Sequence, residues 1–262
     1  MTDDTVSRRE GDIAIPAAAV EAVRRAEVVT VFTGAGMSAD SGIATFRDTE
    51  TGLWARFDPT EIATPAAWQN DPGLVWAWYQ WRARLVRGAA PNAGHRALAS
   101  LERDRGVFVV TQNVDDLHER AGSTAVSHLH GSLFAPRCSN CGRPYQGTDA
   151  DPERAVQEIR VEPPSCPVCL SPVRPGVVWF GEGLPAGEWQ AAENAFAFAD
   201  VVLVVGTSGV VYPAAALPEQ ALDRGVPVIE FNPEPSALSR FVTHSVRASA
   251  AVGLPALLAH VG

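Results

Sequence analysis

Apolar runs and amphipathic stretches alternate along most of the chain. Short β-branched runs predict buried strands at 28–33, 107–110, 177–180, 201–205 and 226–231. Apolar residues at helical spacing predict helices at 16–26, 72–87, 92–103, 187–199 and 213–224. Strands that alternate with helices favour a parallel sheet with helices on both faces, and we therefore expect an α/β fold.

The helix predicted over 72–87 is rich in tryptophan and opens at a proline. Its predicted core-facing stripe, at the spacing i, i+4, i+7 and i+11, comprises Leu74, Trp78, Trp81 and Leu85. Asn92 is the predicted N-cap of the next helix. Two prolines and mixed polarity predict loops and short helices between 55 and 70.

Residues 137–175 differ from the rest of the chain because they are rich in Pro, Gly and Cys. Within them we predict one short helical stretch, at 152–159. We interpret 137–175 as a small module inserted into a single domain that spans 1–262, whose larger part comprises 14–136 and 176–262.

The module contains the four cysteines of the chain, in two pairs of the form Cys-x-x-Cys: Cys138, Cys141, Cys166 and Cys169. Two close pairs suit tetrahedral coordination of one zinc ion by thiolates, and four protein ligands make such a site closed and structural. The alternative is four free cysteines. This spacing suits a metal site in a reducing cytoplasm better than a disulfide framework.

Small or polar residues follow four of the predicted strands. They are Gly34-Ala-Gly36, Gln112-Asn113, Gly206-Thr-Ser208 and Asn232-Pro-Glu234. In open α/β sheets, ligands bind at the carboxyl ends of the strands. We therefore expect these four clusters to converge on one crevice.

The first cluster, Gly34-x-Gly36-x-x-Ala39, has the spacing of a dinucleotide-binding turn between a strand and a helix. Its glycines permit a tight turn and a close approach to a pyrophosphate, whose charge a helix N-terminus favours. The alternative is a tight turn without a ligand. A dehydrogenase would carry an acidic residue ~20 residues on, at the end of its second strand, but no strand precedes 50–58. This argues against hydride transfer and makes Glu234 the better candidate for a ribose or adenine contact.

Charge and composition restrict the partners. The formal net charge of −9 disfavours sequence-independent binding to nucleic acid or to an anionic membrane. All 21 basic residues are arginines. Residues 1–12 do not resemble a secretory or transit signal, and no apolar run has the length of a membrane span, so we expect a cytoplasmic protein.

Four histidines cluster in the middle of the chain: His95, His118, His128 and His130. A lone histidine is more often a capping or packing residue than a base. His130 differs because it follows an apolar stretch and directly precedes the cysteine-rich module. We regard it as a candidate general base, with a packing role as the alternative.

Taken together, these residues resemble the sirtuins, the NAD-dependent protein deacylases. The resemblance extends from about 28 to 255 and rests on motifs in the family's order, namely GAGMSADSGIATFR at 34–47, Thr111-Gln-Asn-Val-Asp115, His130-Gly131, the cysteine pairs, Val178-Trp-Phe-Gly-Glu182, Gly206-Thr-Ser208 and Asn232-Pro233. Ala44 departs from the family, which usually has proline there, and should loosen the cofactor loop slightly. The resemblance implies a Rossmann-like NAD-binding part, a smaller zinc-bearing module packed against it, and an acyl-lysine cleft between the two.

By resemblance, the NAD site comprises Gly34, Ala35, Gly36, Asp40, Phe46, Arg47, Gln112, Asn113, Asp115, Gly206, Thr207, Ser208, Asn232, Pro233, Glu234, Ala250 and Ala251. The implied catalytic residues are His130, Asn113 and Asp115. In the implied reaction, the acyl oxygen attacks the ribose carbon that carries nicotinamide, and nicotinamide leaves. His130 then acts as general base on a ribose hydroxyl, and the products are free lysine and 2′-O-acyl-ADP-ribose.

The resemblance also implies the residues that contact an acyl-lysine protein or peptide. The Val178 backbone is expected to accept a hydrogen bond from the acyl-lysine amide, and Gly181 and Glu182 are expected to pair with the substrate backbone as an added strand. Phe180 is a further expected substrate-binding residue. Tyr79 and Arg82 lie three apart on one face of a predicted helix, where a hydroxyl and a guanidinium can bind a carboxylate. Together with the small residue Ala63, they match the sirtuin subgroup that removes succinyl, malonyl and glutaryl groups, although acetyl-lysine also fits a wide pocket. The alternative is a surface arginine paired with an acidic residue.

Two rival functions stay open. A protein ADP-ribosyltransferase would cleave NAD in the same way but transfer ADP-ribose to a protein nucleophile. A non-enzymatic NAD sensor or zinc-based binding module would not need the general base His130 or the polar pair Asn113 and Asp115. The sequence identifies neither the protein substrates nor the oligomeric state.

Overall fold

A parallel sheet of six strands, in the order β3-β2-β1-β6-β7-β8, is the centre of the larger part of the molecule. The computed structural model describes residues 13–43, 58–147 and 158–261. The strands are β1 (Val28–Thr33), β2 (Gly106–Thr111), β3 (Val126–His128), β6 (Val201–Val205), β7 (Val228–Phe231) and β8 (His244–Val246). The predicted α/β fold and its four central strands are confirmed. β3 and β8 have three residues each, which is too short for periodicity to predict.

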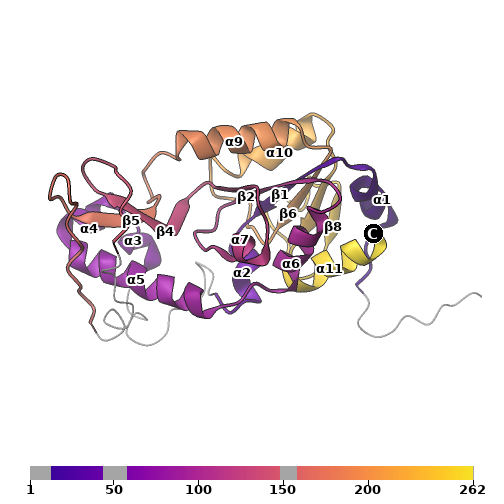
Figure 1. The fold of residues 1–262 in the computed structure, drawn as a ribbon. Coiled ribbons are helices and arrows are strands. Elements are labelled where there is room, and N and C mark those ends of the chain that lie inside the picture. The colour runs from indigo at the N-terminus through magenta and orange to yellow at the C-terminus, as the bar shows by residue number, and fades with distance from the viewer. Residues whose placement is uncertain (1–12, 44–57, 148–157, 262) are drawn as a thin grey trace, which may run out of the picture.

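Helices cover both faces of this sheet (Figure 1). One face carries α1 (Ala17–Arg25), α6 (Ala93–Leu101), α7 (Leu117–Ala121) and α11 (Ala250–Val261). The other carries α9 (Ala186–Ala197) and α10 (Ala216–Asp223). The one-turn helix α2 (Gly36–Ala39) follows β1. In the described ranges, no helix has both the length and the apolar character that a membrane span needs.

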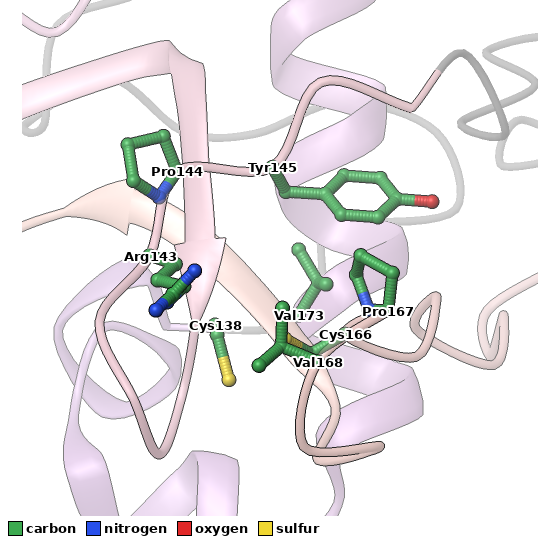
Figure 2. Close-up of a pocket in the computed structure, with 8 residues that line it drawn as sticks. All are labelled: Cys138, Arg143, Pro144, Tyr145, Cys166, Pro167, Val168 and Val173. Atoms are coloured by element: carbon green, nitrogen blue, oxygen red, sulfur yellow. The ribbon is translucent and has the colours of Figure 1, made fainter.

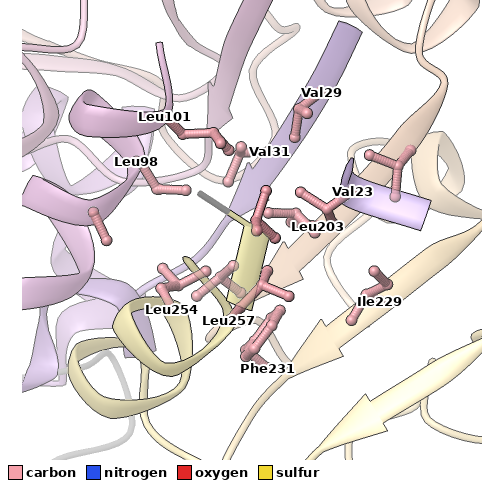
Figure 3. Packing of buried hydrophobic residues seen from close by; sticks show 14 of the residues in the cluster. Val23, Val29, Val31, Leu98, Leu101, Leu203, Ile229, Phe231, Leu254 and Leu257 are labelled. Atoms are coloured by element: carbon pink, nitrogen blue, oxygen red, sulfur yellow. The ribbon is translucent and has the colours of Figure 1, made fainter. Parts of the chain in front are cut away.

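Alternate residues of β1 enter the two cores on either side of the sheet. Val29 and Val31 pack in the cluster beside α6 and α11, which Figure 3 shows from close by. Phe32 points to the opposite side and meets Phe196 of α9 edge to face at 5.9 Å. Since both faces are buried, the central strands are almost continuously apolar, which is why their sequence pattern predicts them well.

The smaller part is built around two antiparallel strands, β4 (Gly131–Cys138) and β5 (Val173–Val177). Three helices pack beside them, α3 (Pro59–Ile62), α4 (Pro65–Asn70) and α5 (Pro72–Gly88), as the left side of Figure 1 shows. The packing unit around the cysteines therefore extends beyond 137–175. The strand predicted at 177–180 is wrong, because β5 ends at Val177 and belongs to this small sheet rather than to the parallel one.

Each of the helices α3, α4 and α5 begins with an acidic or hydroxyl N-cap residue that is followed by proline. The cap side chains of Asp58, Thr64 and Asp71 accept hydrogen bonds from backbone N–H groups two or three residues on, at 2.8, 3.1 and 3.0 Å. Such a cap contributes about 1 kcal/mol, and proline at the first helical position loses no hydrogen bond. These local signals explain why a proline-rich stretch still forms helices.

The core stripe predicted for α5 is partly wrong. Leu85 is 47% exposed, whereas all residues at 75–79 are buried. Five consecutive buried residues mean that this turn of α5 is surrounded on every side, by α4 and by β4 and β5. Leu85 lies beyond these neighbours, near the end of the helix. Tyr79 therefore belongs to the core.

The predicted N-cap Asn92 is confirmed and brings two histidines into the core. Its side chain accepts from the backbone of Gly94 at 2.9 Å, while His95 Nδ1 accepts from the Asn92 N–H at 3.3 Å. His95 and His118 stack edge to face at 4.8 Å and are both fully buried. Burial, with a smaller effect of Arg96, lowers the pKa of His95 to about 4, and burial lowers the pKa of His118 as well. Both rings are therefore neutral in the folded protein.

Acid should destabilise the fold through these two histidines. Because their pKa values are depressed on folding, the stability they contribute is complete above the unfolded pKa of 6.5 and falls as the pH drops toward 4. At about pH 5 the depressed pKa of His95 should cost about 2 kcal/mol of stability relative to pH 7, and His118 should add to this loss. Urea unfolding at these two pH values measures the loss. His118→Gln should reduce it, whereas the same change at exposed His260 should not; equal pH dependence in all three proteins would contradict the assignment.

Candidate active site and metal centre

The loops after β1 and β6 meet backbone to backbone. Gly34 N donates to Val205 O at 3.0 Å, and Gly36 N donates to Gly206 O at 2.8 Å. A Cβ on Gly36 would lie 2.8 Å from the Gly206 Cα, and Gly206 itself has a φ of 59°. No side chain fits at this contact. The glycine motif is therefore needed for the packing of two loops, in addition to any approach to a ligand.

A chain of polar side chains ties the loop after β2 to the loop after β1. Asn113 Nδ2 donates to Gly34 O at 3.0 Å and to Ser38 Oγ at 3.2 Å. The Ser38 hydroxyl donates to Asp115 Oδ2 at 2.9 Å. Burial raises the pKa of Asp115, although its hydrogen bonds from Leu117 N and Ser38 act in the opposite direction. Ser38 was not singled out from the sequence, since only its contact with two distant residues distinguishes it.

Side-chain hydrogen bonds also join the loop after β6 to the loops after β2 and β7. Gln112 Nε2 donates to Thr207 Oγ1 at 2.9 Å, and Asn232 Nδ2 donates to Thr207 O at 2.9 Å. Ser208 O accepts from Ala237 N at 3.1 Å. The four strands concerned are neighbours, β2-β1-β6-β7, so the predicted convergence of their carboxyl ends is confirmed.

The remaining predicted nucleotide-site residues lie around this centre. Asp40 accepts from Ala251 N at 3.3 Å and so connects α2 with the start of α11, where Ala250 is buried. Pro233 and Glu234 are exposed in the loop after β7. Phe46, Arg47 and Ala44 lie outside the described residues, as do 152–157 of the predicted helical stretch.

Glu230 is a residue that the sequence interpretation missed. It is fully buried in β7, and its carboxylate accepts from Ser239 and Ser245 at 2.6 Å each and from Arg247 at 3.0 Å. Burial opposes its ionisation, but these bonds and that with Ser236 outweigh burial and lower its pKa. Glu230 thereby holds the loop after β7. The sequence signal that could have identified Glu230 is a single acidic residue within an apolar strand.

His130 lies beside the loop after β2 with one ring nitrogen occupied. Its Nδ1 is 2.9 Å from Gln112 O, and because a carbonyl only accepts, Nδ1 carries the proton of the neutral ring. Nε2 therefore has a free lone pair. Burial lowers the pKa of His130, so the ring is neutral near pH 7. This is the protonation state that a general base requires.

The other histidines of the cluster have structural partners. His95 and His118 form the buried pair described above. His128 is 2.7 Å from Glu119 Oε1 and 3.1 Å from Asn113 O. Burial disfavours its protonation, but the hydrogen bond and charge of Glu119 outweigh burial and raise the pKa of His128. Of the four, His130 is thus the one with geometry suited to a base.

The segment 178–182 connects His130 with the smaller part of the molecule. Val178 N donates to His130 O at 2.9 Å, and Phe180 N donates to Ala63 O at 3.0 Å. Among the described residues, no hydrogen bond ends at the Val178 carbonyl, the group predicted to contact the substrate. Phe180 is 51% exposed and Gly181 is also exposed.

The Glu182 side chain has a structural partner within the chain. Its carboxylate binds the Arg174 guanidinium through two bonds, at 2.6 and 2.9 Å, and accepts from Trp179 N at 2.9 Å. Burial opposes its ionisation, but Arg174 outweighs burial and lowers the pKa of Glu182. A contact of Glu182 with substrate is therefore left to its backbone.

Tyr79 and Arg82 lie against the same side chain of α5. The Tyr79 ring meets the Trp78 ring edge to face at 4.7 Å, and the Arg82 guanidinium carbon is 5.0 Å from the Trp78 ring centre. Trp179 Nε1 donates to Tyr79 Oη at 3.1 Å. Burial raises the pKa of Tyr79, against a smaller lowering effect of the Arg82 charge. A phenol that keeps its proton and a guanidinium therefore contact the same indole ring, and the Arg82 charge acts on the Tyr79 hydroxyl.

The four cysteines form the predicted cluster. Their sulfur atoms all lie within 4.8 Å of one another, with Cys138 and Cys169 at 3.4 Å and Cys141 and Cys166 at 3.8 Å. Tetrahedral zinc with bonds of about 2.3 Å has sulfur atoms about 3.8 Å apart, so the donor set fits zinc. Figure 2 shows a hollow beside Cys138 and Cys166, lined also by Tyr145 and Val173. It lies at the cysteine cluster and not at the carboxyl ends of the parallel strands.

Removal of one thiolate should therefore release the metal and destabilise the protein. Cys141→Ser is expected to reduce the zinc content from about one ion per chain toward zero and to lower Tm by roughly 5–10 °C. Metal analysis by mass spectrometry and thermal unfolding measure both effects. Ser139→Ala, a change at an exposed neighbour in the same turn, is the matched control. A Cys141→Ser protein with full zinc content would exclude Cys141 as a ligand.

Comparisons with known proteins agree with this arrangement. The family model described as the Sir2 family matches residues 34–213. The chain is 54% identical over 247 residues to NAD-dependent protein deacylase 2 of Corynebacterium efficiens, covering 93% of this chain and 96% of that protein. It is 56% identical over 230 residues to an NAD-dependent protein deacylase of Mycobacterium tuberculosis, covering 88% and 96%. The crystal structure of a Sir2 homologue–NAD complex superposes with a TM-score of 0.86 at 42% identity and covers 97% of this chain and 96% of its own.

Proposed function

The chain belongs to the Sir2 family, and we propose that it is an NAD-dependent protein deacylase that prefers succinyl- and malonyl-lysine. Its relatives' names and the NAD bound to a homologous structure support the cofactor and the reaction class. The acyl preference rests on one observation, the buried Tyr79 hydroxyl on which the positive charge of Arg82 acts.

NAD supplies the electrophile of the proposed reaction, an ADP-ribosyl group that the acyl oxygen captures as nicotinamide leaves. The loops after β1, β2 and β6, tied together by Asn113 and Gln112, would hold it. His130 Nε2 would remove the proton from a ribose hydroxyl, whose oxygen then attacks the acyl-derived carbon. Water completes the release of free lysine and 2′-O-acyl-ADP-ribose. The Nδ1 bond to Gln112 O fixes the ring for this step.

Zinc would have a structural role in this scheme. Four thiolates fill a tetrahedral coordination shell, which leaves no position for water or substrate. The cysteines stabilise the end of β4 and the chain that leads into β5, and β5 in turn precedes the segment that contacts His130. The metal site thus supports the substrate cleft without entering the chemistry.

The acyl pocket would combine a small residue with two polar groups. Ala63 is 3% exposed, and its carbonyl accepts from Phe180 N at 3.0 Å. Tyr79, with its proton retained, can donate to a carboxylate, and Arg82 can pair with it. An acetyl group offers neither interaction, so it would be bound less tightly.

His130→Ala should lower kcat by roughly 10²–10⁴-fold or more while the fold and zinc content stay intact. Nicotinamide release is measured directly, the fate of the ADP-ribosyl group is followed with NAD labelled in its adenine half, and His260→Ala is the control. The deacylase places the label in a small soluble product. Label on protein would indicate an ADP-ribosyltransferase, and substantial residual turnover would remove His130 from the mechanism.

Succinyl-lysine and acetyl-lysine peptides of the same sequence test the acyl preference. A buried arginine–carboxylate pair contributes about 2–4 kcal/mol, so kcat/KM should favour succinyl by roughly 30- to 1000-fold. Arg82→Gln should remove most of this ratio, and Arg84→Gln, two residues on in the same helix, should retain it. A wild-type preference for acetyl would contradict the proposed acyl group and leave the deacylase activity itself untouched.

A further inference from the structure

The hydrogen bond between Trp179 and Tyr79 joins two residues that are distant in the sequence. The indole Nε1–H donates to Tyr79 Oη at 3.1 Å, and the side chains are 2% and 4% exposed. Trp179 stands in the segment that contacts His130 and Ala63, whereas Tyr79 belongs to α5. The bond therefore connects the catalytic side of the cleft with the proposed acyl pocket.

An indole N–H can only donate, so the Tyr79 oxygen accepts in this bond. The phenol proton must then point elsewhere. Among the described residues, no further hydrogen bond involves Tyr79 Oη. Because burial raises the pKa of Tyr79, the proton is retained at neutral pH. The hydroxyl is thus held as a donor with a restricted direction.

The indole ring itself is held on several sides. The Arg174 guanidinium carbon lies 3.4 Å from the centre of the Trp179 ring, and the Trp68 ring lies at 5.7 Å. Glu182 binds both the Arg174 guanidinium and Trp179 N. A ring fixed in this way loses little freedom when it orients a neighbour.

We propose that Trp179 is a positioning residue that directs the Tyr79 O–H toward the acyl group and so increases the selectivity for anionic acyl chains. The proposal rests on the proposed function, since it assumes that Tyr79 binds the acyl carboxylate. It assigns the effect to one hydrogen bond, Nε1–H to Oη, and not to the bulk of the indole.

A double-mutant cycle tests this assignment. The proteins are wild type, Trp179→Phe, Tyr79→Phe and the double variant, with Trp189→Phe on α9 as matched control. The readout is the ratio of kcat/KM for matched succinyl and acetyl peptides. Trp179→Phe should lower this ratio by roughly 5- to 30-fold, mainly through KM for the succinyl peptide, because the bond acts on a charged acyl group far from the reacting atoms.

The double variant separates positioning from packing. If Trp179 acts through the Tyr79 hydroxyl, Trp179→Phe should cause no further loss of preference once Tyr79 is Phe. Equal losses for succinyl and acetyl peptides, additive with Tyr79→Phe, would mean that Trp179 only supports the fold and would overturn the proposal. Preference retained in Trp179→Phe but lost in Arg82→Gln would overturn it and leave the proposed function standing. A wild type without succinyl preference overturns both.

A measurement on Tyr79→Phe covers the case in which Trp179→Phe does not fold. In protein labelled with ¹⁵N-tryptophan, the indole N–H resonance of Trp179 should move to higher field when its acceptor is removed. The other six tryptophans provide the internal reference. If no indole resonance moves, the hydrogen bond does not exist in solution and the proposal is wrong.

Discussion

The contact between the loops after β1 and β6 is the constraint on which the nucleotide end of the molecule depends. At this point the backbones of Gly36 and Gly206 are so close that a single Cβ would collide with main-chain atoms. Once these loops are in place, Thr207 is within reach of Gln112 and Asn232, and Gly34 is within reach of Asn113. Four strand ends thus become one polar surface, whose order follows from the order of the strands in the sheet.

The segment 178–182 has the corresponding role at the substrate end. Its backbone binds His130 on one side and Ala63 on the other, and its Trp179 side chain reaches Tyr79. A partly buried Arg174–Glu182 ion pair holds it in place. Buried ion pairs contribute little net stability because desolvation offsets their attraction, and their value lies in fixing geometry. The proposed base and the proposed acyl pocket are therefore set relative to each other by polar contacts, while the apolar core supplies the stability.

The sequence predicts what periodicity and local chemistry encode. The central strands, the N-cap Asn92 and the paired cysteines all follow from short-range patterns, and the structure confirms them. It could not predict β4 and β5 as a sheet, because both contain proline and pair across a long insertion. The core-facing stripe predicted for α5 is partly wrong because neighbouring elements on all sides bury residues 75–79, whatever their place in the helical periodicity. Trp179 and Glu230 act through contacts between distant segments, which a single sequence does not reveal.

The surroundings of the four histidines determine which of them has a structural role and which is suited to act as a base. His95 and His118 are neutral because they are buried, whereas Glu119 favours the charged form of His128. His130 is also neutral, but its proton is held on Nδ1 by a backbone carbonyl, so that its second nitrogen keeps a lone pair. That carbonyl belongs to Gln112, whose side chain binds Thr207 in the loop after β6. The residue that fixes the proposed base is therefore part of the network that shapes the nucleotide site, so the position of the base and the form of that site are coupled.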